Sequence, residues 1–177
     1  MNAITTFTGR KINPLDPHPD DINIIDIAHA LGNICRYTGH VRSFYSVGEH
    51  SCRVHDLVSV KNRLYGILHD ASEAYICDLA APVKTSKEMK FFKEIEKNLM
   101  DCIYTKYGLD IDEPEEVHVV DKRLGCTEQR DLMPPGSANG NTFEPFDNIV
   151  IRPWTPVVAT SEMQYRIQKL GIEYSKR

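Results

Sequence analysis

A histidine and an aspartate stand side by side at the end of an apolar stretch of this sequence. His69 and Asp70 follow the run Leu64–Leu68, and Glu73 comes within one helical turn of both. Burying an unpaired carboxylate is costly or forces it to take up a proton. A divalent cation removes that cost, because imidazole nitrogens and carboxylate oxygens both ligate metals. The stretch therefore predicts a metal site with an acid–base group beside it, the simpler alternative being a His–Asp pair on a helix surface.

Two further residues of ligand type lie in segments that are predicted to be helical and inward-facing. His50 stands in the first turns of a helix that is predicted to begin at Ser46, and Asp121 is surrounded by apolar residues. Nitrogen and oxygen ligands on three packed helices would enclose a divalent ion and leave positions open for water and substrate. The predicted metal ligands are His50, His69, Asp70 and Asp121.

The elements that must position these residues are mostly helices. Apolar residues recur at helical spacing, with capping residues before and glycine after several of the runs. The only strand-like run is Ile149–Ile151. Pro82 is expected to interrupt the helical structure after the third helix. We predict a single all-α domain over 1–177, a compact multi-helix bundle with irregular segments at 1–20 and 133–158. The predicted helices cover about 21–38, 46–58, 61–75, 86–107, 115–132 and 160–170.

Composition and net charge limit the kinds of partner that the protein can bind. The chain has 177 residues, of which 41% are apolar and 26% charged, and a formal net charge of −4. An acidic balance argues against a dedicated nucleic-acid surface, which is normally basic, although a few local cations can still bind a small anion.

The cysteines and the N-terminal segment favour a cytoplasmic protein. Five scattered cysteines without a Cys-x-x-Cys pair suggest free thiols in a reducing compartment. No apolar run approaches the roughly 18 residues of a membrane span, and the first residues lack the pattern of a signal peptide. We therefore expect no membrane partner.

Longer sequence segments around the predicted ligands resemble those of one enzyme family. The order H…HD…D is similar to that of the HD-domain metal-dependent phosphohydrolases. The words "DIAHALGNICRYTGHVRSFYSVGEHS", "LHDASEAYICDLAAPVK" and "VDKRLGCTEQRDLM" resemble the small prokaryotic and phage branch of that superfamily. This branch includes YfbR-type 5′-nucleotidases and phage dATP triphosphohydrolases, and the likeness extends from about residue 7 to 170.

The resemblance implies a role for each of these motif residues. It makes His50, His69, Asp70 and Asp121 ligands of a divalent ion, which could be Zn, Mn, Co or Mg. It implies that Glu73 and Asp78 are acid–base groups, without dividing the roles between them, and it suggests a homo-oligomer. The implied substrate-binding residues are Arg36 and Lys84 for phosphate, with Tyr37 and His40 nearby.

Several of the implied contacts have structural alternatives. Arg36 at a helix end would interact with the helix dipole, and Lys84 would be a solvated loop lysine. Tyr37 would belong to the core, and His40 would hold its loop. The match departs from the family at Gly48, where relatives often carry Ala or Ser, and at Tyr37, where YfbR-type enzymes carry Trp.

The expected activity is hydrolysis of the phosphate esters of deoxynucleotides. The resemblance favours a dATP triphosphohydrolase, which releases deoxyadenosine and triphosphate, and leaves a 5′-deoxynucleotidase acting on dNMPs as the alternative. A non-catalytic nucleotide- or metal-binding module is the alternative of another class. The acidic net charge disfavours a nuclease, and the absence of a His-His-Glu or Gly-Tyr-Pro signature disfavours a cyclic-dinucleotide phosphodiesterase.

Overall fold

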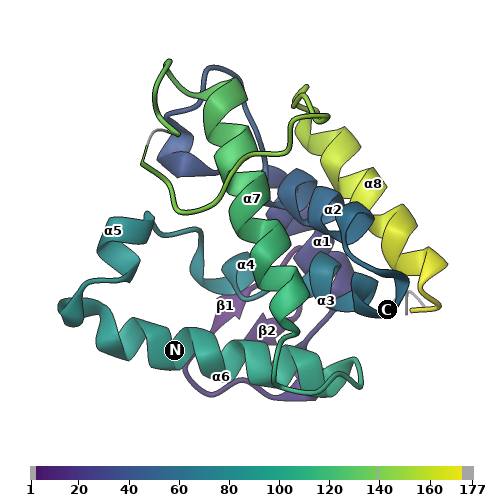
Figure 1. Cartoon of the computed structure of the whole chain (residues 1–177). Helices are drawn as coiled ribbons and strands as arrows, with labels where there is room; N and C mark the ends of the chain where they lie inside the picture. Colours follow the sequence, from purple (N-terminus) through teal and green to yellow (C-terminus); the bar gives the residue numbers. More distant parts are fainter. Residues whose placement is uncertain (1–2, 139, 173–177) are drawn as a thin grey trace.

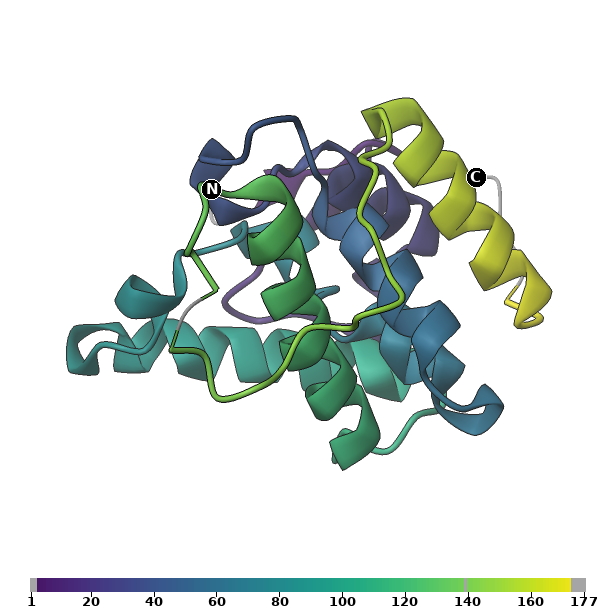
Figure 2. The same ribbon diagram turned by 45° about the horizontal axis from the view of Figure 1, so that its top comes forward.

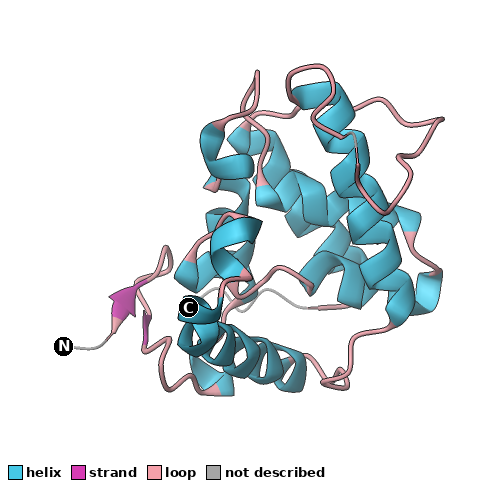
Figure 3. Cartoon of the chain, turned by 60° about the vertical axis from the view of Figure 1, so that its left-hand side comes forward, coloured by secondary structure: helices cyan, strands magenta, loops and turns pink. Residues whose placement is uncertain are grey.

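Helices dominate the part of the chain that the computed structural model describes, residues 3–138 and 140–172 (Figure 1). The predicted all-α class is confirmed at this level, with one small antiparallel hairpin, β1 (Ile4–Thr5) and β2 (Lys11–Ile12), at the edge (Figure 3). No helix in the described part combines the length and the apolar character needed to cross a membrane. The helices are α1 (Ile24–Asn33), α2 (Val47–Leu57), α3 (Arg63–Leu68), α4 (Glu73–Ile76), α5 (Ala81–Lys84), α6 (Lys90–Lys106), α7 (Glu115–Leu132) and α8 (Pro156–Lys169).

One apolar core joins the long helices. Helix α2 packs against α1, α3, α7 and α8, so it lies at the centre of the bundle. Helices α5 and α8 lie on opposite sides of the molecule in two views (Figures 1 and 2). Burial of the apolar faces provides the main stabilisation of such a bundle. Fully buried side chains come from each long helix and include Leu31, Val54, Ile67, Leu99, Leu124 and Met163.

Glycines let α2 approach its neighbours closely. A Cβ atom added to Gly48 would lie 2.9 Å from the backbone nitrogen of Gly32 in α1. A Cβ atom on Gly66 of α3 would lie 3.1 Å from the backbone of His55 in α2. The first distance is shorter than real Cβ contacts, and the second is tighter than most of them, so a larger residue at either position would require the neighbouring backbone to move. Glycine at position 48 therefore has a packing reason in this chain.

The first helix is shorter than predicted. It ends at Asn33, and the prediction of a helix to residue 38 was wrong. The next residues are extended, with Cys35 opposite Ser46 in an antiparallel bridge and the N–H of Arg36 donating to the carbonyl of Tyr45 at 2.9 Å. Apolar residues at the end of the run pack in this extended form, so their helical spacing was misleading. Arg36 consequently does not stand at the end of α1.

The predicted helix over 61–75 is interrupted at the His–Asp motif. Helix α3 ends at Leu68, and α4 begins only at Glu73. Between them the N–H of Ala71 donates to the carbonyl of Leu68 at 2.8 Å, three residues back. Such bonds wind the backbone more tightly than an α-helix. The prediction of one continuous helix was therefore wrong, and tight turns carry His69 and Asp70.

Smaller differences concern the last third of the chain and Pro82. Helix α7 matches the predicted bounds 115–132, whereas α8 begins at Pro156, behind the capping hydroxyl of Thr155, and not near 160. The strand-like run Ile149–Ile151 is irregular chain, as predicted for the segment 133–158. Asp131 of α7 accepts a hydrogen bond from the N–H of Ile151 at 2.8 Å and holds that chain in place. Pro82 lies in the first turn of α5, where its missing N–H costs nothing.

Replacing Gly48 by alanine should destabilise the fold. The added methyl group meets backbone atoms of α1 that cannot move without separating the helices. We expect the free energy of unfolding to fall by about 1–3 kcal/mol in urea denaturation. Gly125→Ala in α7 is the matched control, because nothing lies within 4 Å of its added Cβ. The control should be neutral or stabilising by about 0.5–1 kcal/mol, and an equal loss in both variants would contradict the packing argument.

Candidate metal centre

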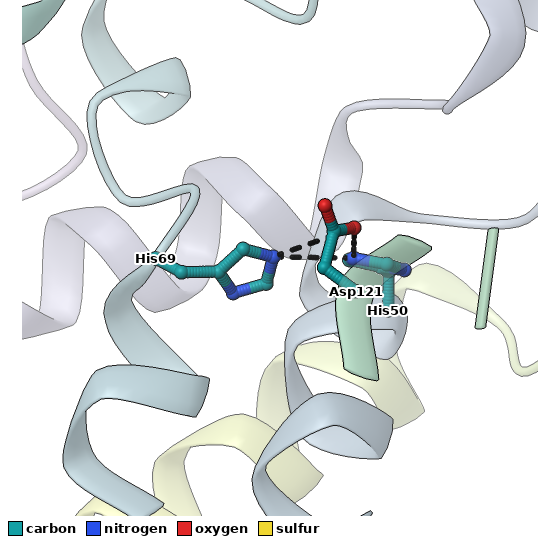
Figure 4. A group of neighbouring side chains, drawn as sticks. All are labelled: His50, His69 and Asp121. Carbon is teal, nitrogen blue, oxygen red and sulfur yellow. Dashed lines mark hydrogen bonds and ion pairs between the residues drawn. The ribbon is translucent and has the colours of Figure 1, made fainter. Parts of the chain in front are cut away.

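Side chains from three parts of the chain meet around His50 of α2, which is fully buried (Figure 4). The Nε2 atom of His50 lies 3.2 Å from Nε2 of His69. It also lies 3.0 Å from Oδ1 of Asp121 in α7, and His69 Nε2 is 4.0 Å from the same oxygen. The three ligand atoms lie within 4.8 Å of one another, so this group could hold a metal ion.

Asp70 supplies the fourth predicted ligand atom. Its Oδ2 lies 3.3 Å from Nε2 of His69 and 3.8 Å from Nε2 of His50. In a tetrahedral site with bonds of about 2.0–2.1 Å, neighbouring ligand atoms are about 3.3 Å apart. Asp70 therefore lies beside both imidazoles, while the group whose ligand atoms all lie within 4.8 Å of one another comprises His50, His69 and Asp121.

The second nitrogen of each imidazole contacts an acceptor. Nδ1 of His69 lies 3.0 Å from the carbonyl oxygen of Gly66, and Nδ1 of His50 lies 2.6 Å from Oε1 of Glu128. Acceptors of this kind place the ring proton on Nδ1 and leave the Nε2 lone pair for a metal. Two bare lone pairs 3.2 Å apart would repel, so this arrangement favours a cation or an extra proton beside the two nitrogens. The donor set fits a divalent cation.

The charges in the cluster lead to the same conclusion. Burial lowers the pKa of His69, but the Asp70 carboxylate outweighs it and raises that pKa to about 10. Burial acts against ionisation of Asp121, yet the hydrogen bond from His50 holds its pKa well below the usual range. The acids thus favour positive charge at the imidazoles, and a bound cation would take the place of the ring protons.

A large open cavity adjoins the cluster. Its volume is about 790 Å³, within the range of small-molecule sites, and it reaches Asp70 and Asp121. The predicted acid–base and substrate residues all line it. These are Arg36, Tyr37, His40, Glu73, Asp78 and Lys84.

Glu73 is an unusual acid in this cavity. Glu73 is the first residue of α4 and is only 5% exposed. Its Oε2 atom has no hydrogen-bond partner among the described residues. Burial, together with the charges of Asp70 and Asp78, raises the pKa of Glu73 to about 9. Burial also raises the pKa of Asp78. Two carboxyl groups beside a candidate metal site therefore have perturbed protonation, as acid–base groups do.

The two residues predicted to bind phosphate already pair with carboxylate groups of the protein. Arg36 Nη1 lies 3.3 Å from Oδ2 of Asp70, and Lys84 forms an ion pair with Glu96 across the cavity wall. The alternative of Arg36 as a helix-dipole partner is wrong, because the preceding helix ends at Asn33. The alternative of a freely solvated Lys84 is also wrong, because its ammonium group is paired with Glu96.

Tyr37 and His40 occupy different environments. The Tyr37 hydroxyl donates to Oε2 of Glu128 at 2.8 Å, so its polar end is held inside the protein while the residue still lines the cavity. His40 is exposed at the cavity wall. Neither position assigns a role, and substrate contact stays a prediction for both.

Comparison with known proteins shows the family to which the chain belongs. The chain is 38% identical to the uncharacterized protein YfdR of Escherichia coli over 132 residues, which cover 75% of this chain and 73% of YfdR. It is 37% identical over 112 residues to an uncharacterized protein of Rhodobacter capsulatus, covering 58% and 57% of the two chains. The chain belongs to the YfdR family. No family model matches it.

Sequence reasoning missed one residue of this YfdR-family site. Glu128 is fully buried, and its two carboxylate oxygens contact both a predicted metal ligand and the cavity wall. It follows Asp121 by seven residues on α7, two helical turns, so both side chains lie on one helix face. That spacing was the available signal.

Backbone strain gathers beside the same cavity. Among the described residues other than glycine, the positive φ angles are those of Tyr37 (56°), Thr38 (53°) and Cys77 (63°). Tyr37 and Thr38 line the cavity, and Cys77 directly precedes Asp78, which lines it too. Such conformations cost about 1–3 kcal/mol each and persist where the surrounding structure imposes them, often at functional sites.

Added Zn²⁺ or Mn²⁺ should stabilise this YfdR-family protein against heat. At a free metal concentration of 100 times Kd, the gain is about 2.7 kcal/mol, which a thermal shift assay detects as a higher Tm. Asp121→Asn removes a charged ligand and should abolish most of the shift. His118→Ala, on an exposed part of the same helix, should leave it unchanged. Equal shifts in wild type and Asp121→Asn would contradict the metal centre.

Proposed function

We propose that the protein is an HD-domain phosphohydrolase, and that it cleaves the ester bond between phosphorus and O5′ of deoxynucleotides with the help of a divalent cation. One observation supports the proposal above all: Glu73 and Asp78 line the same cavity as Asp70 and Asp121. A binding module has no need of two further acids beside its metal ligands. The resemblance of the sequence to HD-domain enzymes provides the reaction class.

In this proposal Glu73 and Asp78 each carry out one of the two proton transfers. A bound divalent cation would lower the pKa of a water molecule and withdraw charge from the phosphoryl oxygens. The water oxygen bonds to phosphorus, the bond from phosphorus to O5′ breaks, and the leaving O5′ takes a proton. Glu73 is the better proton donor, because its pKa of about 9 keeps it protonated at neutral pH. Asp78 is left to accept the proton of the water.

The charge of the cavity bears on the choice between dATP and a dNMP. Its described lining carries four lysine and arginine side chains and five carboxyl groups. A divalent cation would bring the sum of these charges to about +1, or to about +2 with one acid protonated. A nucleoside monophosphate dianion balances that charge, whereas a triphosphate exceeds it. The sequence resemblance favours the dATP reaction, and the cavity charge favours the monophosphate; both break the same ester bond.

A panel of nucleotides decides between the two substrates. The purified protein is incubated with each dNMP and each dNTP in the presence of Mn²⁺, Co²⁺ or Zn²⁺, and the release of phosphate and of triphosphate is measured. Phosphate from dNMPs would establish the 5′-deoxynucleotidase, and triphosphate from dATP would establish the triphosphohydrolase. If metal binds and no nucleotide is hydrolysed, the chain is a binding module.

Glu73→Gln should abolish most of the turnover without loss of metal. The amide keeps the shape of the side chain but cannot donate the proton to O5′, so kcat should fall by about 100-fold or more. Metal content, measured by elemental analysis, should match that of the wild type. Glu94→Gln, on the exposed face of α6, is the matched control and should leave kcat unchanged. Unaltered kcat in Glu73→Gln would remove Glu73 from the mechanism.

A further inference from the structure

Glu128 is the most fully engaged carboxylate near the candidate metal centre. Its Oε1 lies 2.6 Å from Nδ1 of His50 and accepts a hydrogen bond from the Tyr45 hydroxyl at 2.8 Å. Its Oε2 accepts from the Tyr37 hydroxyl at 2.8 Å and lies 3.2 Å from Nε of Arg36. A carboxylate has about four acceptor positions, so hydrogen-bond contacts fill three of them here and Arg36 adds an ion pair.

Those contacts hold the Glu128 carboxylate in one orientation. The Arg36 guanidinium, 3.2 Å away, compensates the charge of this buried group. A fully buried charge needs partners for its lone pairs, and here they come from α2 and from residues 36–45, which precede it in the chain. Rotation of the carboxylate would break contacts with at least two of them.

We propose that Glu128 is a positioning residue, which fixes His50 with its proton on Nδ1 and its Nε2 lone pair directed at the cation. The inference rests on the metal centre of the proposed function and adds to it the group that sets the metal affinity. Glu128 contacts the opposite side of the His50 ring from Nε2, so it would not itself be a ligand of the cation. A carboxylate behind a histidine ligand both orients the ring and increases its basicity, and losing such a partner lowers metal affinity by about 10- to 100-fold.

The chain contains a matched control for this role. Glu49 is also fully buried, and it pairs with Arg53 at 2.6 Å and accepts a hydrogen bond from the N–H of Trp154 at 2.6 Å. None of these contacts involves a predicted metal ligand. Glu49→Gln and Glu128→Gln therefore make the same chemical change in equally buried places, and only the second removes the carboxylate behind His50.

The test compares Zn²⁺ affinity of the folded variants by competition with a chelator. We expect Glu128→Gln to weaken binding by about 10- to 100-fold and Glu49→Gln to stay within about twofold of the wild type. Equal affinities of Glu128→Gln and the wild type, or equal losses in both variants, would overturn the inference. So would a wild-type protein that binds no Zn²⁺.

A second measurement needs no variant, in case Glu128→Gln fails to fold. Nitrogen NMR of the imidazole rings in the Zn²⁺-loaded wild type should show the His50 proton on Nδ1, and a proton on Nε2 would overturn the inference. Failure of the proposed function is separately visible. A protein that shows the expected affinity ratio but hydrolyses no nucleotide would retain the positioning role of Glu128 and lose the enzymatic proposal.

Discussion

The structure depends on bringing two imidazole nitrogens to within 3.2 Å of each other in a buried place. Lone pairs at that distance repel, and burial removes the water that would screen them. Asp70 and Asp121 supply negative charge around the same point, which favours a positive ion between the rings. The rest of the fold can be understood as a means of holding these groups together.

The backbone provides the rigidity that such a cluster needs. Gly48 and Gly66 allow α2 to approach α1 and α3 closely, so the helix that carries His50 is held on two sides. Tight turns replace α-helix at His69 and Asp70, directly after the buried end of α3. Helix α7 then places Asp121 and Glu128 on one face, the first toward the cluster and the second behind His50.

The cavity adds the second half of the chemistry. It brings Glu73 and Asp78 beside the cluster, with cations paired to acids along its wall. Strained backbone at Tyr37 and Cys77 shows that the surrounding structure imposes conformations that these residues would not adopt alone. Candidate metal ligands, acids and strain therefore coincide in one region of a YfdR-family protein, which is why a hydrolytic function is proposed for it.

The sequence by itself determined the helical class, the bounds of α7 and the identity of the residues that converge on His50. Side-chain chemistry and apolar periodicity are local properties, and these features depend on them. Only the tertiary structure decided where the first helix ends, how the His–Asp turn is wound and which acid lies behind His50. Those outcomes depend on contacts between segments far apart in the chain, such as Glu128 with Tyr45, and no local pattern encodes a partner 83 residues away.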